Sequence, residues 1–252
     1  MSDKLVPDIA FDKVSKGFNG REVLSDVSFE VAAGEVLCIM GRSGMGKSVT
    51  LKLIIGLLTP EAGNIGVKGR SIIGMDEDGL SQTRRQMGFL FQSGALYSPV
   101  SLGDNLALPL SRFTKKSNQE IDALVETRLD DVGLGKERDK MPAELSGGMV
   151  KRAGLARALI LDPCILLADE PTSGLDRVTA SEIDDLLLKL KEKNKTTMVI
   201  VTHDIREARL LGDRLAVLDQ GRVAAIGRIQ ELETSGNELV RALVSEEVCH
   251  AH

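Results

Sequence analysis

The hydrophobic pattern divides the chain into stretches with strand periodicity and one long stretch with helical periodicity. Residues 9–31 alternate between apolar and polar positions around a turn at residues 17–20, which predicts a small antiparallel sheet. Continuous apolar runs, which predict buried strands, occur at residues 36–40, 165–168 and 198–201. The pattern therefore predicts an α/β fold in which a mixed central sheet is accompanied by an antiparallel β subdomain.

Between residues 93 and 158 the spacing of the apolar residues changes. From residue 121 to residue 129 they recur at three and four positions, which is typical of a helix that packs one face on a core. This stretch is predicted to be an α-helical subdomain inserted into the α/β core. Residues 215–226 are predicted to form a closing hairpin, and residues 229–246 a charged helix.

A glycine-rich loop separates the first buried run from residues 49–58, an apolar stretch long enough for a helix. Glycines let the backbone turn tightly and point successive N–H groups at an anion, and the N-terminus of the following helix adds partial positive charge. The order of strand, loop and helix predicts a polyphosphate site, in which Lys47 reaches the phosphates and Ser48 ligates Mg²⁺. A glycine-rich turn that binds nothing is the alternative. The loop and the residue after it are Gly41, Arg42, Ser43, Gly44, Met45, Gly46, Lys47, Ser48 and Val49.

Polar side chains follow three of the predicted strands. They are Gln92, the adjacent pair Asp169 and Glu170, and His203. Because ligand-facing groups collect at strand ends in open α/β sheets, we expect these side chains at one edge. Two carboxylates at an apolar strand tip are costly without a cation or water, so Asp169 is expected to hold Mg²⁺ and Glu170 to polarise an attacking water. A surface turn at the carboxylates and a structural role for His203 are the alternatives.

The bulk composition narrows the class of protein. A net charge of −5 and a pI of about 5.4 argue against a sequence-independent nucleic-acid binder, so no nucleic-acid partner is expected. The chain starts without a charged-then-apolar signal segment, and its apolar runs are shorter than the roughly 20 residues that cross a bilayer, which predicts a soluble, intracellular protein. Cys38 and Cys164 lie in apolar runs and are expected to be buried, and Cys249 is expected to be a surface thiol.

Four shorter segments each leave two interpretations open. Phe18 could stack on a purine or serve as a core or turn residue. Residues 146–148 could form a second anion site at a helix start, or an ordinary N-cap. Residues 94–100 suit a partner-docking surface and an internal packing loop about equally. The apolar positions between residues 239 and 244 could contact a neighbouring subunit or their own domain.

Taken together, these segments resemble the ATP-binding subunit of an ABC transporter from about residue 8 to residue 235. The glycine-rich loop matches the Walker A motif, residues 165–169 match Walker B, and Gln92 and His203 match the Q-loop and H-loop residues, all in family order. The residues that match the signature motif are Leu145, Ser146, Gly147 and Gly148, and those that match the D-loop are Ser173, Gly174, Leu175 and Asp176.

The resemblance implies a domain organisation. Residues 1–235 would form the ABC ATPase domain. Within it, residues 1–92 and 159–235 would supply a RecA-like P-loop NTPase core together with the β subdomain. Residues 93–158 would form the helical signature subdomain, and residues 236–252 a C-terminal tail.

The resemblance also implies a head-to-tail homodimer with two ATP molecules and Mg²⁺ at its interface. Each ATP would be held by the Walker A loop of one copy and by the signature motif of the other. Ser48, Gln92 and Asp169 would form the metal site. Glu170 and His203 would act on the attacking water and the γ-phosphate, as catalytic residues together with Gln92. Phe18 would stack on adenine.

Finally, the resemblance implies a membrane partner. The protein would lie on the cytoplasmic face of the inner membrane, where a loop after Gln92 contacts an integral membrane permease; its contact residues would be Ala95, Leu96, Tyr97, Ser98 and Pro99. Residues 91–97 and 141–149, with methionine at position 149, resemble the branch that serves Mla- and Mce-type lipid transporters. That branch implies phospholipid transport, an Mce-domain lipid-binding protein and a small accessory subunit.

Three other assignments stay open on the sequence alone. The chain could be a soluble ABC-type ATPase of repair or translation, a transporter ATPase for an amino acid, metal or drug, or a P-loop kinase. The acidic pI and the lack of a sizeable insertion that could grip nucleic acid count against the first. A kinase would leave residues 146–148 and His203 without a role. Subunits of the transporter type do not contact cargo, so the residues do not identify it.

Overall fold

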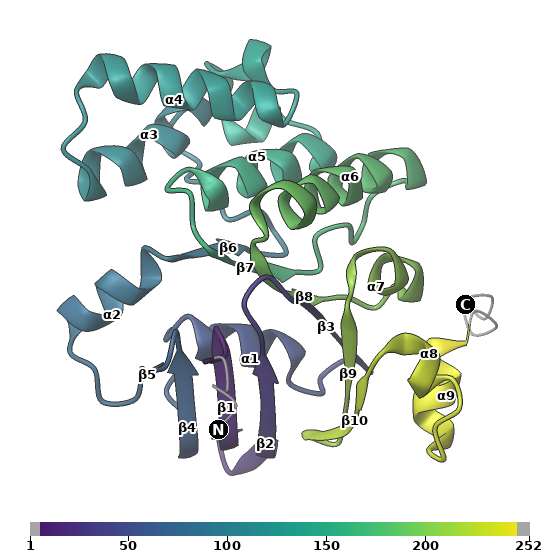
Figure 1. The fold of residues 1–252 in the computed structure, drawn as a ribbon. Coiled ribbons are helices and arrows are strands. Elements are labelled where there is room, and N and C mark those ends of the chain that lie inside the picture. Colours follow the sequence, from purple (N-terminus) through teal and green to yellow (C-terminus); the bar gives the residue numbers. More distant parts are fainter. Residues whose placement is uncertain (1–5, 246–252) are drawn as a thin grey trace.

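Two β-sheets and the helices around them form the part of the chain that the computed structural model describes, residues 6–245 (Figure 1). The smaller sheet is antiparallel with the strand order β2-β1-β4-β5. Phe11 and Phe29 are register partners in this sheet and their rings stack with centroids 4.5 Å apart, which fits the predicted alternation of residues 9–31. The strands of this sheet are β1 (Ile9–Phe18), β2 (Arg21–Val31), β4 (Ala62–Val67) and β5 (Arg70–Ser71).

The larger sheet has the order β10-β9-β3-β8-β7-β6, and its strands are parallel except for β10, which closes a hairpin with β9. The predicted mixed sheet with a separate antiparallel sheet is therefore confirmed. The strands of the larger sheet are β3 (Val36–Gly41), β6 (Met87–Leu90), β7 (Ile165–Asp169), β8 (Thr197–Val201), β9 (Arg214–Asp219) and β10 (Arg222–Gly227).

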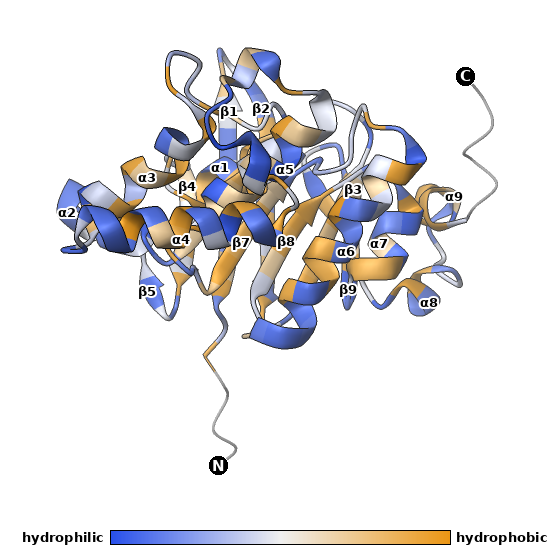
Figure 2. Cartoon of the chain, turned by 90° about the horizontal axis from the view of Figure 1, so that it is seen from above, coloured by the Kyte–Doolittle hydropathy of each residue, from blue (hydrophilic) through white to orange (hydrophobic). Residues whose placement is uncertain are grey.

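The larger sheet is buried on both faces, which explains why its central strands are continuous apolar runs. Along β3, Leu37 and Ile39 face a core shared with the smaller sheet and with α1 (Lys47–Ile54), whereas Cys38 and Met40 face the opposite core. The second core is covered by α5 (Gly147–Leu159), α6 (Arg177–Asn194) and α7 (Ile205–Leu211). In Figure 2, β7 and β8 are apolar along most of their length, while the helices outside them alternate between polar and apolar residues.

A third core lies inside the helical subdomain, which stands above the sheet in Figure 1. Leu106, Val125 and Ala156 from its three α-helices are all fully buried there. Helix α5 contributes to this core and to the core of the larger sheet, so it joins the two parts of the molecule. The elements of this subdomain are α3 (Leu102–Phe113), α4 (Asn118–Asp131), the 3-10 turns η1 (Gly135–Glu137) and η2 (Pro142–Glu144), and α5; α2 (Glu77–Arg84) precedes β6.

Two expectations are wrong in detail. The charged helix predicted at 229–246 is divided into α8 (Ile229–Leu232) and α9 (Glu238–Val244), with Gly236 between them and Asn237 as the N-cap of α9. Cys164 is exposed rather than buried, because it lies just before β7, whereas Cys38 lies inside β3 and is buried. Cys249 lies outside the described residues.

The C-terminal apolar positions pack on their own domain. Val240 and Val244 are fully buried in the second core, and Leu243 packs against the same core, which agrees with one of the two interpretations of this face. Leu239 follows the N-cap of α9 and its N–H donates to Asn237 Oδ1. The rest of the predicted tail, beyond residue 245, lies outside the described residues.

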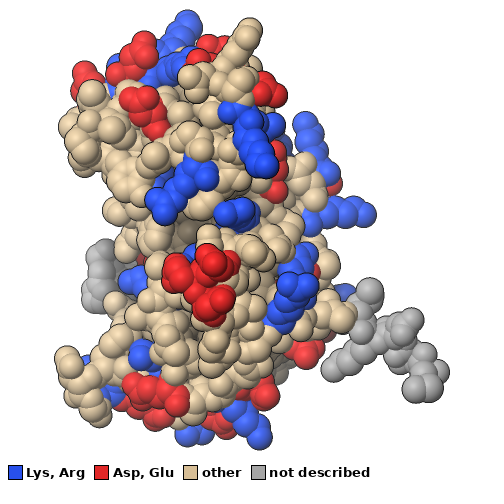
Figure 3. All heavy atoms as spheres, turned by 90° about the vertical axis from the view of Figure 1, so that its left-hand side faces the viewer, with Lys and Arg blue, Asp and Glu red and all other residues tan. Residues whose placement is uncertain are grey.

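Two surface properties bear on partners. Within residues 6–245, every helix is too short or too polar to cross a bilayer. On the face shown in Figure 3, lysine and arginine side chains are intermixed with aspartate and glutamate side chains over the whole surface. That face therefore presents a mixed charge pattern, not one extended basic field.

Candidate ATP-binding and hydrolysis site

The phosphate loop connects β3 to α1 at the carboxyl edge of the larger sheet. Its last glycine, Gly46, is the N-cap of α1 and has φ 89°, a left-handed conformation that favours glycine. A Cβ at this position would lie 2.5 Å from Leu24 Cδ2, so the close approach of β2 also requires glycine. Because glycine has no capping side chain, the first N–H groups of α1 remain available to an anion.

Lys47 lies at the base of the loop with its side chain turned inward. Its Nζ donates to the carbonyl oxygens of Gly41 at 2.8 Å and Arg42 at 3.1 Å, and the residue is 8% exposed. Burial lowers the pKa of Lys47, and the nearby carboxylates of Glu170 and Asp169 oppose that shift. The loop thus holds an amine whose charge a polyphosphate would stabilise.

Ser48 and Asp169 form the pair of oxygens expected for Mg²⁺. Ser48 Oγ donates to Asp169 Oδ1 at 2.9 Å, so the first turn of α1 and the end of β7 meet here. Burial raises the pKa of Asp169, while the bond from Ser48 lowers it. A cation would therefore be stabilised by the carboxylate and would itself favour the ionised form.

The number of protein ligands at this position also fits Mg²⁺. Among residues 6–245, no group of three or more histidine, cysteine, aspartate and glutamate side chains is placed to hold a metal. Mg²⁺ prefers octahedral oxygen ligands and keeps several waters or substrate phosphates in its shell, so one carboxylate and one hydroxyl are a suitable protein share. Zinc would require a fuller set of protein ligands.

Glu170 is the meeting point of the three strand ends. Gln92 Nε2, after β6, donates to Glu170 Oε2 at 3.0 Å, and His203 Nδ1, after β8, lies 3.7 Å from Glu170 Oε1. The structure therefore brings Gln92, Glu170 and His203 together, with Asp169 one residue before Glu170 on the same strand end. Glu170 itself has φ 48°, an uncommon conformation for a residue other than glycine.

A lysine that the sequence reasoning left without a role also contacts this group. Lys151 Nζ donates to the carbonyl oxygen of Glu170 at 2.7 Å and to Ser173 Oγ at 3.4 Å, although Lys151 belongs to α5. It is 6% exposed. The signal in the sequence is a lysine on the buried face of α5, between Gly148 and Leu155 at helical spacing.

The signature residues begin α5 and lie near the D-loop and the first turn of α6 in the same chain. Ser146 is the N-cap, and its Oγ accepts from the Met149 N–H at 3.3 Å. A Cβ on Gly147 would be 3.8 Å from Leu175 Cδ2, and one on Gly148 would collide with Thr179. Ser146 and Gly147 are exposed, and Leu145 packs against the helical core. The expected contact of these residues with a nucleotide involves a second copy and stays a prediction.

The D-loop leads from Glu170 into α6. Ser173 Oγ donates to the Glu170 carbonyl oxygen at 3.0 Å, and Gly174 has φ 74°. Asp176 is the N-cap of α6 and accepts from the N–H groups of residues 178 and 179. The hydrogen bond from Thr179 Oγ1, at 2.6 Å, and then these N–H groups lower the pKa of Asp176. The D-loop is therefore anchored at both ends, by Glu170 and by the start of α6.

Phe18 ends β1 and is 41% exposed, which excludes a core role. Lys16 Nζ lies 5.2 Å from the centroid of its ring. The neighbouring strand β2 approaches the phosphate loop, since Gly46 packs against Leu24. A partly exposed ring at this end of the antiparallel sheet is compatible with stacking on a base and with a turn residue.

The loop at residues 95–99 is anchored on one side and exposed on the other. Asn105, fully buried in α3, accepts from the Tyr97 N–H at 2.7 Å and donates to the Tyr97 carbonyl oxygen at 3.1 Å. Arg157 from α5 donates to the Ala95 carbonyl oxygen and lies 4.4 Å from the centroid of the Tyr97 ring. Leu96 packs against the helical core, whereas Tyr97 is 49% exposed, and Ser98 and Pro99 are exposed.

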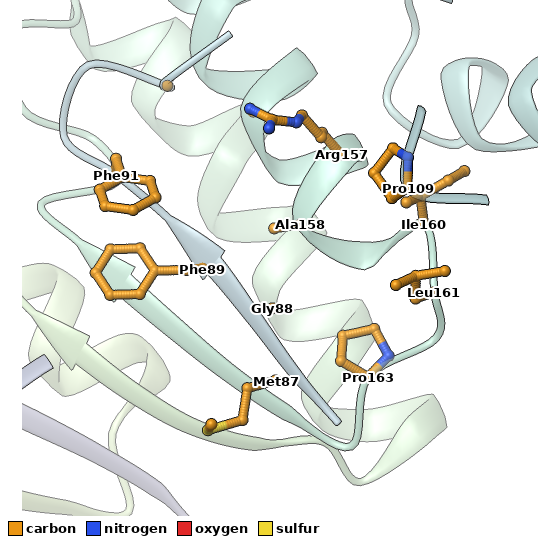
Figure 4. Close-up of a pocket in the computed structure, with 12 residues that line it drawn as sticks. Met87, Gly88, Phe89, Phe91, Pro109, Arg157, Ala158, Ile160, Leu161 and Pro163 are labelled. Atoms are coloured by element: carbon orange, nitrogen blue, oxygen red, sulfur yellow. The ribbon is translucent and has the colours of Figure 1, made fainter. Parts of the chain in front are cut away.

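A hollow of about 180 Å³ lies beside this loop, between the edge strand β6 and α5 (Figure 4). The rings of Phe89 and Phe91 stack on one side with centroids 4.0 Å apart, and Arg157 and Pro109 lie on the other. Sequence reasoning did not identify Asn105 or Arg157, which shape this region. An asparagine within the leucine stripe of α3 was the available signal for Asn105.

Comparison with known proteins places these residues in a family context. The sequence matches the ABC transporter family over residues 24–173. It is 43% identical to the probable ribonucleotide transport ATP-binding protein mkl of Mycobacterium leprae, over 92% of this chain and 67% of the relative. It is 41% identical to the methionine import ATP-binding protein MetN of Cupriavidus metallidurans, over 88% of this chain and 65% of the relative. The chain thus spans about two thirds of the length of these relatives.

Solved structures agree with the sequence comparison. A dimeric ATP-binding cassette in a post-hydrolysis state with ADP and phosphate superposes with a TM-score of 0.82, at 34% identity over 87% of this chain and 98% of that one. The protein cbiO1 of Clostridium perfringens, part of the ABC transporter complex cbiONQ, superposes with a TM-score of 0.79, at 27% identity over 94% of this chain and 98% of that one.

Proposed function

The chain belongs to the ABC transporter family, whose ATP-binding domains hydrolyse ATP, and we propose that it is the ATP-hydrolysing subunit that drives an integral membrane permease. The observation that carries the proposal is the convergence of three strand ends on Glu170, next to the Ser48–Asp169 pair. That arrangement supports the proposal, because the hydrolysis of a phosphoanhydride would need a carboxylate beside the bound metal and phosphates.

The chain's own residues would share the work of hydrolysis. Lys47 and the N–H groups at the start of α1 would bind the phosphates, and Ser48, Gln92 and Asp169 would hold Mg²⁺. Mg²⁺, when bound, would neutralise charge that develops on the phosphate oxygens. Glu170 would orient the attacking water and accept its proton. Gln92 and His203 would hold Glu170 and contact the γ-phosphate.

We further propose a head-to-tail homodimer. Its interface would place the signature residues of one copy on the ATP held by the other, with the D-loops, residues 173–176, beside them. The exposure of Ser146 and Gly147 at the start of α5 supports this, because both are open to a partner. So does the similarity to a dimeric cassette solved with ADP and phosphate. ATP binding would close the dimer and hydrolysis would reopen it.

The permease would bind where the loop at 95–99 meets the hollow beside β6. The exposed ring of Tyr97 and the aromatic wall of Phe89 and Phe91 offer an apolar surface to a short cytoplasmic segment of the permease. Gln92 connects this surface to Glu170 through one hydrogen bond. Closure of the dimer at the ATP site would therefore be transmitted through Gln92 to the permease contact. The protein would then lie on the cytoplasmic face of the inner membrane as a peripheral subunit.

For the cargo we propose phospholipid, carried between membranes with an Mce-domain protein and a small accessory subunit. The sequences of residues 91–97 and 141–149 support this choice, because they resemble the branch that serves Mla- and Mce-type lipid transporters. A second cargo class, small polar metabolites taken up by an importer, is favoured by the names of the relatives, which refer to ribonucleotide transport and methionine import. In either case the ATPase chemistry is the same.

The test is a gentle detergent purification of the tagged native complex, followed by mass spectrometry of its proteins and bound lipids. Recovery of a multi-span permease with an Mce-domain protein and phospholipid would support the full proposal. A permease with a soluble binding protein and no lipid would retain the ATPase role and reject the lipid cargo. Absence of any membrane protein, with active ATPase, would reject the permease partner.

A further inference from the structure

We infer that Lys151 is a positioning residue that makes the placement of Glu170 depend on the signature segment of the same subunit. The inference rests on the proposed function and adds a route by which one ATP site senses the other. Lys151 lies five residues after Ser146 on α5, and its Nζ donates to the carbonyl oxygen of Glu170 at 2.7 Å. One helix thus connects a surface for the partner's ATP with the catalytic glutamate of its own subunit.

The burial of Lys151 shows that this contact is built into the fold. A buried ammonium group is costly unless acceptors and negative charges compensate it. Lys151 is 6% exposed, and its acceptors are the Glu170 carbonyl oxygen and Ser173 Oγ. Burial lowers the pKa of Lys151, and the nearby carboxylates of Glu170, Asp169 and Glu207 oppose that shift. An exposed lysine on α5 would need none of these partners.

The backbone of Glu170 is the element that Lys151 controls. Glu170 has φ 48°, a conformation that persists only where neighbouring groups hold it. Its N–H donates to the Val201 carbonyl oxygen at 2.8 Å, and its carbonyl oxygen accepts from Lys151 and Ser173. The backbone dihedrals set the direction of the carboxylate, which contacts Gln92 at 3.0 Å. Loss of the bond from Lys151 would remove the shortest of the hydrogen bonds to this carbonyl oxygen and leave those from the N–H and Oγ of Ser173, at 3.3 and 3.0 Å.

Ser146 is the N-cap of α5 and Lys151 lies early in the same helix, with Gly148 packed closely against Thr179 between them, so we expect this part of α5 to shift as one body. The two residues are about 7.5 Å apart along the helix axis, at 1.5 Å per residue. A shift of Ser146 on engaging the partner's nucleotide would therefore shift Lys151, and with it the carbonyl group of Glu170. Each glutamate would reach its working position only when the other site is occupied, which predicts cooperative hydrolysis.

The experiment compares steady-state ATP hydrolysis and nucleotide binding in the full-length chain and its Lys151→Met variant, a replacement of similar length that removes the donor and the charge. We expect kcat to fall by about 10 to 100-fold, because small misplacements of a catalytic group have effects of that size. KM for ATP and the monomer's affinity for ATP should stay within about twofold, and the Hill coefficient should fall towards 1. Lys151→Arg, which keeps a donor, should restore most of kcat.

Two controls separate positioning from other causes. Lys116→Met removes an exposed lysine from the α3–α4 connection and should change none of these quantities. If Lys151→Met does not fold, Lys151→Gln and Lys151→Arg take its place, and the arginine variant should have the higher kcat. Unchanged kcat and Hill coefficient in a folded Lys151→Met variant would overturn the inference, as would equal losses of kcat and ATP affinity. Glu170→Gln, measured alongside, tests the proposed function itself. If Glu170→Gln loses activity and Lys151→Met does not, the inference about Lys151 is rejected and the proposed function is retained.

Discussion

The edge of the sheet that carries Glu170 and the start of α5 that carries the signature residues are built in different ways. At the sheet edge, the ends of three parallel strands place Gln92 Nε2 3.0 Å and His203 Nδ1 3.7 Å from the carboxylate of Glu170. At the start of α5, Ser146 caps its own helix and is exposed. One region is assembled within a single chain, and the other presents its surface outward.

The difference follows from how each region is held. The strands of the sheet are buried on both faces and paired in register, so the residue after each strand has little freedom. The start of α5 is positioned by its cap and by packing of Gly148 against Thr179, which leaves Ser146 and Gly147 exposed. The chain therefore contains one group of residues that is assembled within a single copy, at the sheet edge, and one exposed surface, at the start of α5. This is the arrangement that the proposed dimer interface requires.

The largest expected effect concerns the complete region. Glu170→Gln should keep ATP binding and lower hydrolysis by about 10² to 10⁴-fold, because it removes the group that we propose accepts the proton of the attacking water. Single-turnover hydrolysis and nucleotide binding are the measurements. Glu192→Gln, on the exposed face of α6, is the matched control and should keep full activity. Full turnover in the Glu170→Gln variant would remove Glu170 from its proposed role.

The next effect concerns the outward-facing region. Ser146→Arg should lower hydrolysis by the dimer about 100-fold or more, since it places a bulky cation where the partner's ATP is expected, and leave ATP binding by the monomer intact. Ser146→Ala separates the loss of the cap, which costs about 1 kcal/mol of stability, from the added bulk. ATPase activity and monomer binding are measured for both. Loss of monomer binding in Ser146→Arg would contradict a site shared between two copies.

The same comparison explains how much the sequence could predict. The strand ends and the phosphate loop were predicted because they depend on local patterns, namely apolar runs and closely spaced glycines. Their meeting at one edge followed from a rule about parallel sheets. Cys164 was misplaced because the apolar run around it contains the strand boundary, and exposure changes abruptly there.

Contacts between distant elements were not predictable in the same way. Lys151 and Arg157 were visible as charges in a helical run, but their acceptors, Glu170 and Ala95, lie on other elements. Asn105 likewise depends on the fold of the loop that it holds. Gly236 lies in the break between α8 and α9. Both helices are short and pack in the second core, so their bounds depend on tertiary contacts that the local sequence does not show.

A smaller effect tests the proposed permease surface. Tyr97→Ala should reduce ATP-driven transport about tenfold, as loss of an exposed aromatic contact does at an interface, and leave basal hydrolysis within about twofold. Leu96→Ala should instead lower stability by about 1 to 2 kcal/mol, because Leu96 packs against the helical core. Transport in reconstituted vesicles and thermal unfolding are the two measurements. Unchanged transport in Tyr97→Ala would move the permease contact elsewhere.

The smallest effect concerns a pair of acids on two neighbouring helices, α6 and α7. Glu207 on α7 and Asp184 on α6 are adjacent, and Thr172 Oγ1 donates to Glu207 Oε1 at 3.0 Å. Burial, together with the neighbouring acids, raises the pKa of Glu207 to about 7 and that of Asp184 to about 6. The folded protein therefore keeps a proton that the unfolded chain releases, so stability is highest below the ordinary glutamate pKa and falls as the pH rises through about 7.

Glu207→Gln removes this titration and keeps a carbonyl acceptor for Thr172. We expect the wild-type protein to lose at least about 1 kcal/mol of stability between pH 5 and pH 8, since one unit of pKa shift corresponds to about 1.4 kcal/mol, and the variant to lose clearly less. Denaturant unfolding at the two pH values is the measurement, with the exposed Glu192→Gln as the control. The same loss in wild type and Glu207→Gln would show that this pair does not hold the proton. Since neither acid is among the residues proposed to bind the phosphates or the metal, kcat at neutral pH should stay within about threefold of the wild-type value.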